Sequence, residues 1–148
     1  MKTWILASFV TAFLFGAYNI FAKMAAGKLS DSLAAFILEF SAAMLVLAYI
    51  LFGRNLKQDL AEASTMGIVY AVIGGLFIGG GSIFYFYVFR SEATLSIAGP
   101  IIFAGATLVM VTAGIVIFKE KLDLITIGGM LLTLAGIALL SISANRVQ

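Results

Sequence analysis

Cysteine and histidine are both absent from this chain of 148 residues. Without cysteine the chain can form no disulfide bond and no iron–sulfur cluster, and it has no thiolate nucleophile. Without histidine, most zinc sites and a Ser–His–Asp catalytic triad are excluded as well. The sequence contains no Walker-type phosphate loop, and its acidic and hydroxyl side chains form no defensible pair of nucleophile and base. We therefore expect neither an enzyme nor a bound cofactor or metal ion.

Charge is also scarce, at 11% of the residues against about 25% in a typical soluble domain. The net charge of +2 is too small for a nucleic-acid-binding surface. Hydrophobic residues make up 63% of the chain, which is more than a soluble fold of this length can remove from water. Intrinsic disorder is excluded because it requires low hydrophobicity and high charge. The composition predicts a protein embedded in the lipid bilayer, without a nucleic-acid partner.

Five stretches are long and apolar enough to cross a bilayer, whose core of about 30 Å requires roughly 20 helical residues. Because lipid tails offer the backbone no hydrogen-bond partner, each stretch is predicted to be a helix. Among the nine basic and seven acidic residues, only Glu39 lies inside a stretch. We predict an all-α membrane protein with a single domain, residues 1–148. Its five transmembrane helices are expected at residues 3–22, 33–52, 66–89, 95–118 and 124–142.

The basic residues hardly favour one orientation in the membrane. If the spans alternate in direction, one side carries five of them: Lys2, Arg54, Lys57, Lys119 and Lys121. The other side, here called the far face, carries four: Lys23, Lys28, Arg90 and Arg146. The positive-inside rule acts on this difference of one. Two alternatives stay open: every copy has a cytoplasmic N-terminus, or the protein inserts both ways and pairs as an antiparallel homodimer, like the inverted repeats of larger transporters.

Three short motifs follow one another along the chain in an order that characterises a known family. They are FGAYNIFAK at residues 15–23, LSIAGP at residues 95–100, and FKEKL at residues 118–122 before a glycine-containing last helix. Together they resemble the EamA-type branch of the drug/metabolite transporter superfamily, over residues 4–142. Full-length relatives usually carry two inverted five-helix units, so the resemblance implies a half unit that pairs with a second copy or with a related five-helix protein. Many relatives place Arg before the Phe of the second helix, where this chain has Glu39, so their substrate charge preference does not transfer.

A layer about 8–10 Å below the far face is predicted to hold the functional groups, because every helix places a polar residue, glycine or proline there. The candidates for substrate binding or coupling are Glu39, Asn19, Tyr18, Lys23, Ser82 and Tyr85. The candidates for hinges or loosened backbone are Gly16, Gly79, Gly80, Gly81 and Pro100. Packing is the alternative for the glycines, since Ala71, Gly75 and Gly79 form a small-residue stripe that lets another helix approach.

Glu39 is the leading candidate for chemistry. An ionised carboxylate inside a bilayer is costly, so it should face the bundle interior and find a partner. A carboxyl group that binds either a proton or a cationic substrate gives antiport by competition. The structural alternative is a static contact of Glu39 with Asn19 or Lys23. Lys23 could instead extend to the lipid headgroups. The tyrosines could instead form an aromatic belt at the membrane interface; they are Tyr18, Tyr85 and Tyr87.

We predict a small multi-pass transporter of the cell (inner) membrane, working as an antiparallel dimer. Its substrates are expected to be metabolites or amphiphilic and cationic small molecules, exchanged for protons. Two alternatives are a half-subunit of a flippase for a lipid-linked sugar, and a structural or regulatory membrane subunit without transport activity.

Overall fold

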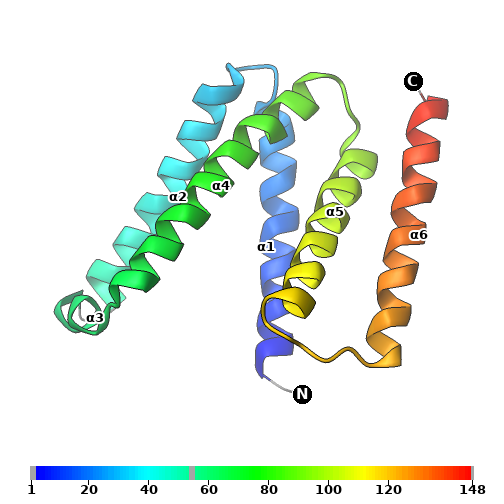
Figure 1. Cartoon of the computed structure of the whole chain (residues 1–148). Helices are drawn as coiled ribbons and strands as arrows, with labels where there is room; N and C mark the ends of the chain where they lie inside the picture. The colour runs from blue at the N-terminus through cyan, green and yellow to red at the C-terminus, as the bar shows by residue number, and fades with distance from the viewer. Residues whose placement is uncertain (1–2, 54–55, 148) are drawn as a thin grey trace. The chain divides into compact units, whose positions relative to one another are not determined.

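The computed structural model describes residues 3–53 and 56–147, with the backbone alone for residues 57, 58 and 144–147 (Figure 1). Within that part the regular elements are all helices, and five are long and apolar enough to cross a membrane. The long helices are α1 (Thr3–Ala25), α2 (Asp31–Gly53), α4 (Thr65–Arg90), α5 (Leu95–Val116) and α6 (Leu124–Val147). This confirms the predicted all-helical membrane fold with five spans. Of the basic residues counted for orientation, Lys2, Arg54, Lys57 and Arg146 lie outside the described side chains.

The stretch between the second and third spans contains a short helix, α3 (Leu56–Glu62), which the sequence pattern did not predict. After it, Ser64 caps α4: its side-chain oxygen accepts a hydrogen bond of 3.0 Å from the backbone N–H of Gly67. A serine cap satisfies one of the free N–H groups in the first helical turn. The loop thus fixes where α4 begins.

The end of α5 differs from the expected boundary at residue 118, since the helix ends at Val116. The backbone N–H of Phe118 donates to the carbonyl of Ala113 at 3.2 Å, and that of Glu120 donates to Gly114 at 3.0 Å. These bonds satisfy the last carbonyls of α5 while the chain reverses. Lys119 makes the reversal in a left-handed backbone conformation, with φ of 55°. This is the geometry in which glycine usually ends a helix.

Asp123 directly precedes α6. Its carboxylate accepts a hydrogen bond of 2.8 Å from the backbone N–H of Thr126. This contact with Thr126 lowers the pKa of Asp123, as expected when a hydrogen bond favours the charged form. The FKEKL motif and the Asp123 that follows it therefore connect α5 to α6 in a compact turn.

The chain forms two compact units, and each is described by itself. Unit 1 (Met1–Glu92) contains α1 to α4, and unit 2 (Ala93–Gln148) contains α5 and α6. In unit 2 the two helices pack against each other, and Gly99 and Gly114 are buried in α5. The single domain over residues 1–148 stays a prediction.

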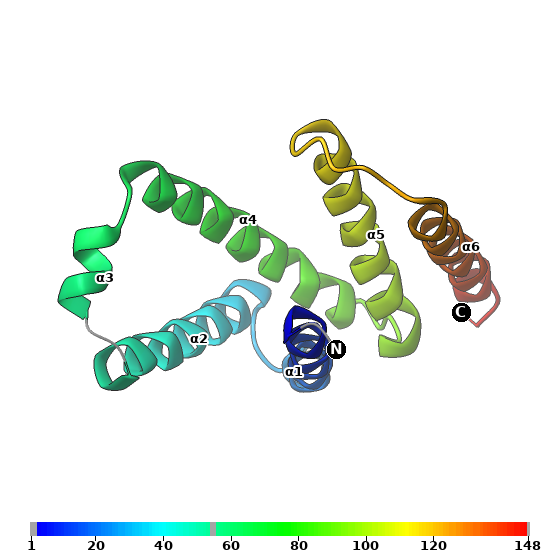
Figure 2. The ribbon, with the colours of Figure 1, turned by 90° about the horizontal axis from the view of Figure 1, so that it is seen from below.

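In unit 1, α4 packs along α2 and approaches α1 near its own C-terminal end (Figure 1). Figure 2 shows α2 and α4 diverging toward α3. The buried residues of these helices all lie toward the opposite end, where α1 ends and α2 begins. They are Asn19 and Ala22 in α1, Ala34 and Ala35 in α2, and Ser82, Tyr85, Phe86 and Phe89 in α4. The core of unit 1 therefore sits next to the far face.

Glycine at position 119 should stabilise the protein. Lys119→Gly is expected to raise the free energy of unfolding by roughly 0.5–1 kcal/mol, because left-handed strain of about 1–2 kcal/mol exceeds the entropy that glycine adds to the unfolded chain. Thermal unfolding of purified protein in detergent measures the change. Lys121→Gly is the matched control, since it removes the same charge from the same loop where φ is not positive. Equal melting temperatures for the two variants would contradict the assignment of strain to Lys119.

Candidate functional site

The polar residues of unit 1 form three layers, and α4 contributes to each of them. The inner layer joins Glu39 to Ser82, the middle layer joins Asn19 to Tyr85, and the outer layer gathers charged groups around the end of α4. Counted back from Arg90 along α4, Tyr85 lies about 7 Å and Ser82 about 12 Å below the far face. The layers therefore follow one another along the membrane normal.

In the inner layer, the hydroxyl of Ser82 donates a hydrogen bond of 2.5 Å to a carboxylate oxygen of Glu39. Ser82 is buried and Glu39 is half-buried, so α2 presents its acidic residue to α4. A hydrogen bond to a charged group contributes roughly 1.5–3 kcal/mol. An acidic side chain at the centre of a membrane helix costs about 2.5–3.5 kcal/mol. One hydroxyl therefore offsets the cost of the ionised carboxylate at most in full, and over most of these ranges only in part.

In the middle layer, the phenol of Tyr85 donates to the side-chain carbonyl of Asn19. The amide of Asn19 donates in turn to the backbone carbonyl of Phe15, one turn earlier in α1. The ring of Tyr18 lies beside that of Tyr85, with centroids 5.7 Å apart, and the carboxylate of Glu39 is within electrostatic range of the Tyr18 phenol. Of the two tyrosines, Tyr18 is thus the one that interacts with the acidic group, and Asn19 holds α1 and α4 together.

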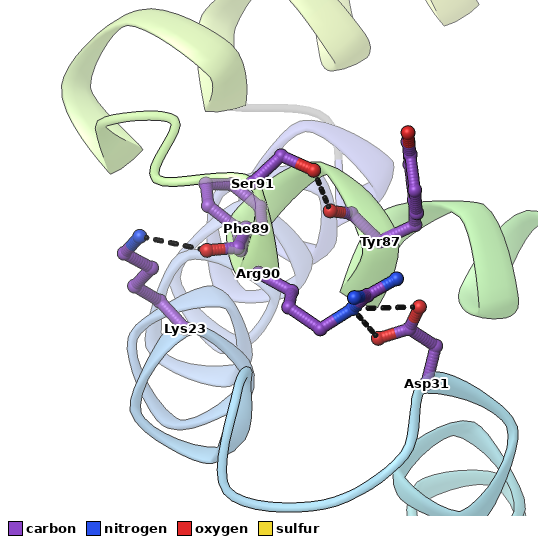
Figure 3. A network of polar contacts seen from close by, with 6 residues as sticks. All are labelled: Lys23, Asp31, Tyr87, Phe89, Arg90 and Ser91. Atoms are coloured by element: carbon purple, nitrogen blue, oxygen red, sulfur yellow. Dashed lines mark hydrogen bonds and ion pairs between the residues drawn. The ribbon is translucent and has the colours of Figure 1, made fainter.

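The outer layer ties the ends of three helices together (Figure 3). Lys23, in the last turn of α1, donates to the backbone carbonyl of Phe89 at 3.1 Å, and its ammonium lies 5.3 Å from the centre of the Phe89 ring. Arg90, the last residue of α4, contacts both carboxylate oxygens of Asp31 through one guanidinium nitrogen, at 2.9 and 3.1 Å. Asp31 is the first residue of α2. The positive groups sit at helix C-termini and the negative one at an N-terminus, as the helix dipoles favour.

The structure places all six polar candidates from the sequence in unit 1 and links them by these contacts. The partner of Glu39 is Ser82, in place of the expected alternatives Asn19 and Lys23. Lys23 lies against the end of α4 and is half-buried. Tyr87 differs from the other two tyrosines: it is exposed, and its ring lies 5.3 Å from the Arg90 guanidinium. Their roles in binding or coupling stay predictions.

The hinge candidates lie in regular helix. α4 is continuous from Thr65 to Arg90, so Gly79, Gly80 and Gly81 are wound as α-helix. A β-carbon added at any of the three, or at Gly16 or Gly75, would meet nothing within 4 Å. Close packing of these glycines is therefore not realised within unit 1. Pro100 lies inside the helix α5 of unit 2. Bending at any of these positions stays a prediction.

Sequence reasoning missed the partners in the outer layer, Asp31 and Arg90, and the aromatic residues Phe86 and Phe89. A signal for the first two was present, because opposite charges stand at the start of one apolar stretch and the end of the next. The aromatic residues share one helix face with Ser82 and Tyr85, at spacings of three and four residues. A buried face can be recognised in a sequence only when the opposite face of the helix is polar. Since α4 is apolar on all sides, the spacing of these residues does not indicate which face is buried.

The membrane-spanning helices of unit 1 contain the carboxylate of Glu39 and several aromatic rings. Over residues 3–53 and 56–147, no three acidic side chains gather in a way that could hold a metal ion. The carboxylate of Glu39 offers a negative charge, and the nearby tyrosine faces attract cations through their π-electrons. The same carboxyl group can instead hold a proton.

Comparison with known protein families gives a match over nearly the whole chain. The family model described as EamA-like transporter family matches residues 2–142 of the chain. No curated protein gives a significant match, and no solved structure does.

The contact between α1 and α4 should contribute measurably to stability. Tyr85→Phe is expected to lower the free energy of unfolding by about 0.5–1.5 kcal/mol, because it removes the donor to the buried Asn19. Tyr87→Phe is the matched control on the same helix, where the tyrosine is exposed, and should change stability less. Unfolding in mixed micelles, followed by circular dichroism, measures both. The assignment fails if Tyr87→Phe is as destabilising as Tyr85→Phe.

Proposed function

Because the chain belongs to the EamA-like transporter family, we propose that it carries cationic, amphiphilic small molecules across the cell (inner) membrane in exchange for protons, with Glu39 as the coupling group. Family membership and the five apolar helices establish a multi-pass membrane protein of transporter type. The substrate class and the coupling ion are the further steps, and they rest on the site in unit 1.

The observation that carries the proposal is the setting of Glu39. It is the one acidic residue within an apolar stretch, it is half-buried, and in the described part of the chain the hydroxyl of Ser82 donates to it. A carboxylate in this setting can gain either a proton or a cationic partner. A cation bound at the carboxylate excludes the proton, and a proton on the carboxyl group removes the charge that attracts the cation. Exchange of one for the other follows from this competition.

The aromatic cluster that begins at Tyr18, the tyrosine that interacts with Glu39, supports a cation with an apolar body. Tyr18 and Tyr85 lie with ring centroids 5.7 Å apart, and the Phe89 ring is 4.7 Å from that of Tyr85. The attraction between an aromatic face and a desolvated cation is worth about 2 kcal/mol or more. A small hydrophilic cation would gain less from these rings than an amphiphilic one.

The proposal predicts that coupling is lost with the carboxyl group. In liposomes containing purified protein, an acidic interior should drive uptake of radiolabelled tetraphenylphosphonium. Glu39→Gln should lower this gradient-driven uptake about tenfold or more, because a charged contact worth roughly 1.5 kcal/mol or more is removed. Glu92→Gln removes a carboxyl group from an exposed turn and should transport as the unaltered protein does.

Uptake by Glu39→Gln with unchanged dependence on the proton gradient would disprove coupling through Glu39. Uptake absent from the unaltered protein as well, for this probe and for other organic cations, would favour the flippase half-subunit or the structural subunit. In those alternatives the carboxyl group of Glu39 has a role that an assay of cation uptake does not measure.

We further propose that the working unit is an antiparallel dimer. The described chain has five spans, and an odd number places its two ends on opposite sides of the membrane. The basic residues differ by one between the two faces, which is too small a bias to impose one orientation. Two copies inserted in opposite senses would reproduce the inverted pairing on which alternating access depends in larger transporters.

Sidedness of a C-terminal tag tests this arrangement. We expect comparable amounts of tag on each side of the membrane. Ala63→Lys, in the exposed loop before α4, doubles the charge difference and should shift most copies to one orientation, while Ala63→Gln should not. A tag found on one side only in the unaltered protein would contradict dual insertion.

A further inference from the structure

We propose that the outer layer is a gate that closes the Glu39 site toward the far face. Asp31 and Arg90 form its latch, and Lys23 holds the end of α4 against α1 (Figure 3). The inference rests on the proposed transport function, since a gate has a role only where a site must open to two sides in turn.

Burial along the helices of unit 1 supports the gate. All buried residues of α1, α2 and α4 lie in the halves next to the far face, between the outer layer and the level of Glu39. In the other halves, each described residue is half-buried or exposed. Figure 2 shows α2 and α4 spreading apart in that direction. The three helices thus close over the site on one side and separate on the other.

The contacts of the outer layer converge on the last two residues of α4. Phe89 receives Lys23 through its backbone carbonyl, and Arg90 binds Asp31. Each contact joins helices whose residues are 59 to 66 positions apart in the chain. A single displacement of this helix end would therefore release α1 and α2 together. Such joint release of α1 and α2 is what a single gate requires.

The exposure of the latch fits a contact that opens repeatedly. The Arg90 side chain is 50% exposed and that of Asp31 is 16% exposed. Ion pairs accessible to water are weak, because water competes for both charges. A pair this weak lets thermal motion populate an open state.

The natural absence of cysteine allows a direct test by single-cysteine labelling. Ala35 is 3% exposed and lies one helical turn inside Asp31, so Ala35→Cys reports on access beneath the gate. The full chain carrying this cysteine is placed in lipid nanodiscs and reacted with a membrane-impermeant maleimide. Ala63→Cys, in the exposed loop on the other side of the bilayer, controls for the reactivity of the reagent.

In the otherwise unaltered chain, Ala35→Cys should react much more slowly than Ala63→Cys. Asp31→Asn and Arg90→Gln should each speed labelling of Ala35→Cys by roughly two- to fivefold, the factor expected for loss of an exposed ion pair. The double variant, Asp31→Asn with Arg90→Gln, should label little faster than either single variant, because each substitution already removes the same ion pair. Arg90→Lys retains the charge and should keep labelling slow. Labelling of Ala63→Cys should stay constant throughout.

The gate is disproved if neither Asp31→Asn nor Arg90→Gln speeds labelling, or if Ala35→Cys is already as reactive as Ala63→Cys. It is also disproved if Arg90→Lys labels as fast as Arg90→Gln, since the ion pair would then not matter. Circular dichroism of each variant separates opening from unfolding. Because labelling involves no proton gradient and no substrate, failure of proton coupling leaves its outcome unchanged, and the two proposals fail independently.

Discussion

A carboxyl group inside a bilayer has to obtain its hydrogen-bond donors from its own protein, because neither lipid tails nor the paired backbone of a helix has any to give. In this chain the donor is the hydroxyl of Ser82 on α4. The contact requires α2 and α4 to lie against each other with both residues at one depth. When α2 and α4 pack in this way, Tyr85 on the same face of α4 contacts Asn19. At the end of α4, Arg90 then lies next to Asp31. The arrangement of unit 1 thus follows from the need to accommodate one acidic residue.

The triglycine in α4 stands directly before Ser82, and the helix runs through it without a break. Each glycine within a helix costs about 1 kcal/mol relative to alanine. The space around these glycines is open within unit 1, so contacts inside that unit do not explain the cost. Approach of a second copy and bending of α4 would each use this absence of side chains. Both fit a site that has to change its surroundings during transport.

The sequence predicted the fold well because span length and charge distribution are dictated by the bilayer. All five spans were recognised, and Glu39 and Ser82, which the sequence placed at one depth, are in contact. Helix ends were less predictable: the left-handed Lys119 ends α5 early, and α3 arises in a short polar linker with no apolar period. Which residues pair was not predictable either. Helix rotation decides whether Glu39 meets Ser82 or Asn19, and a uniformly apolar sequence gives no periodic pattern from which to read that rotation.

The central claim is that a proton and a cation compete for Glu39. Calorimetric titration of tetraphenylphosphonium into the purified protein, in two buffers with different ionisation enthalpies, measures the protons released as the cation binds. The titration is repeated across the pH range in which the protein is stable. The account predicts release of protons by the unaltered protein and none by Glu39→Gln. Binding by the unaltered protein without proton release at any pH would contradict it.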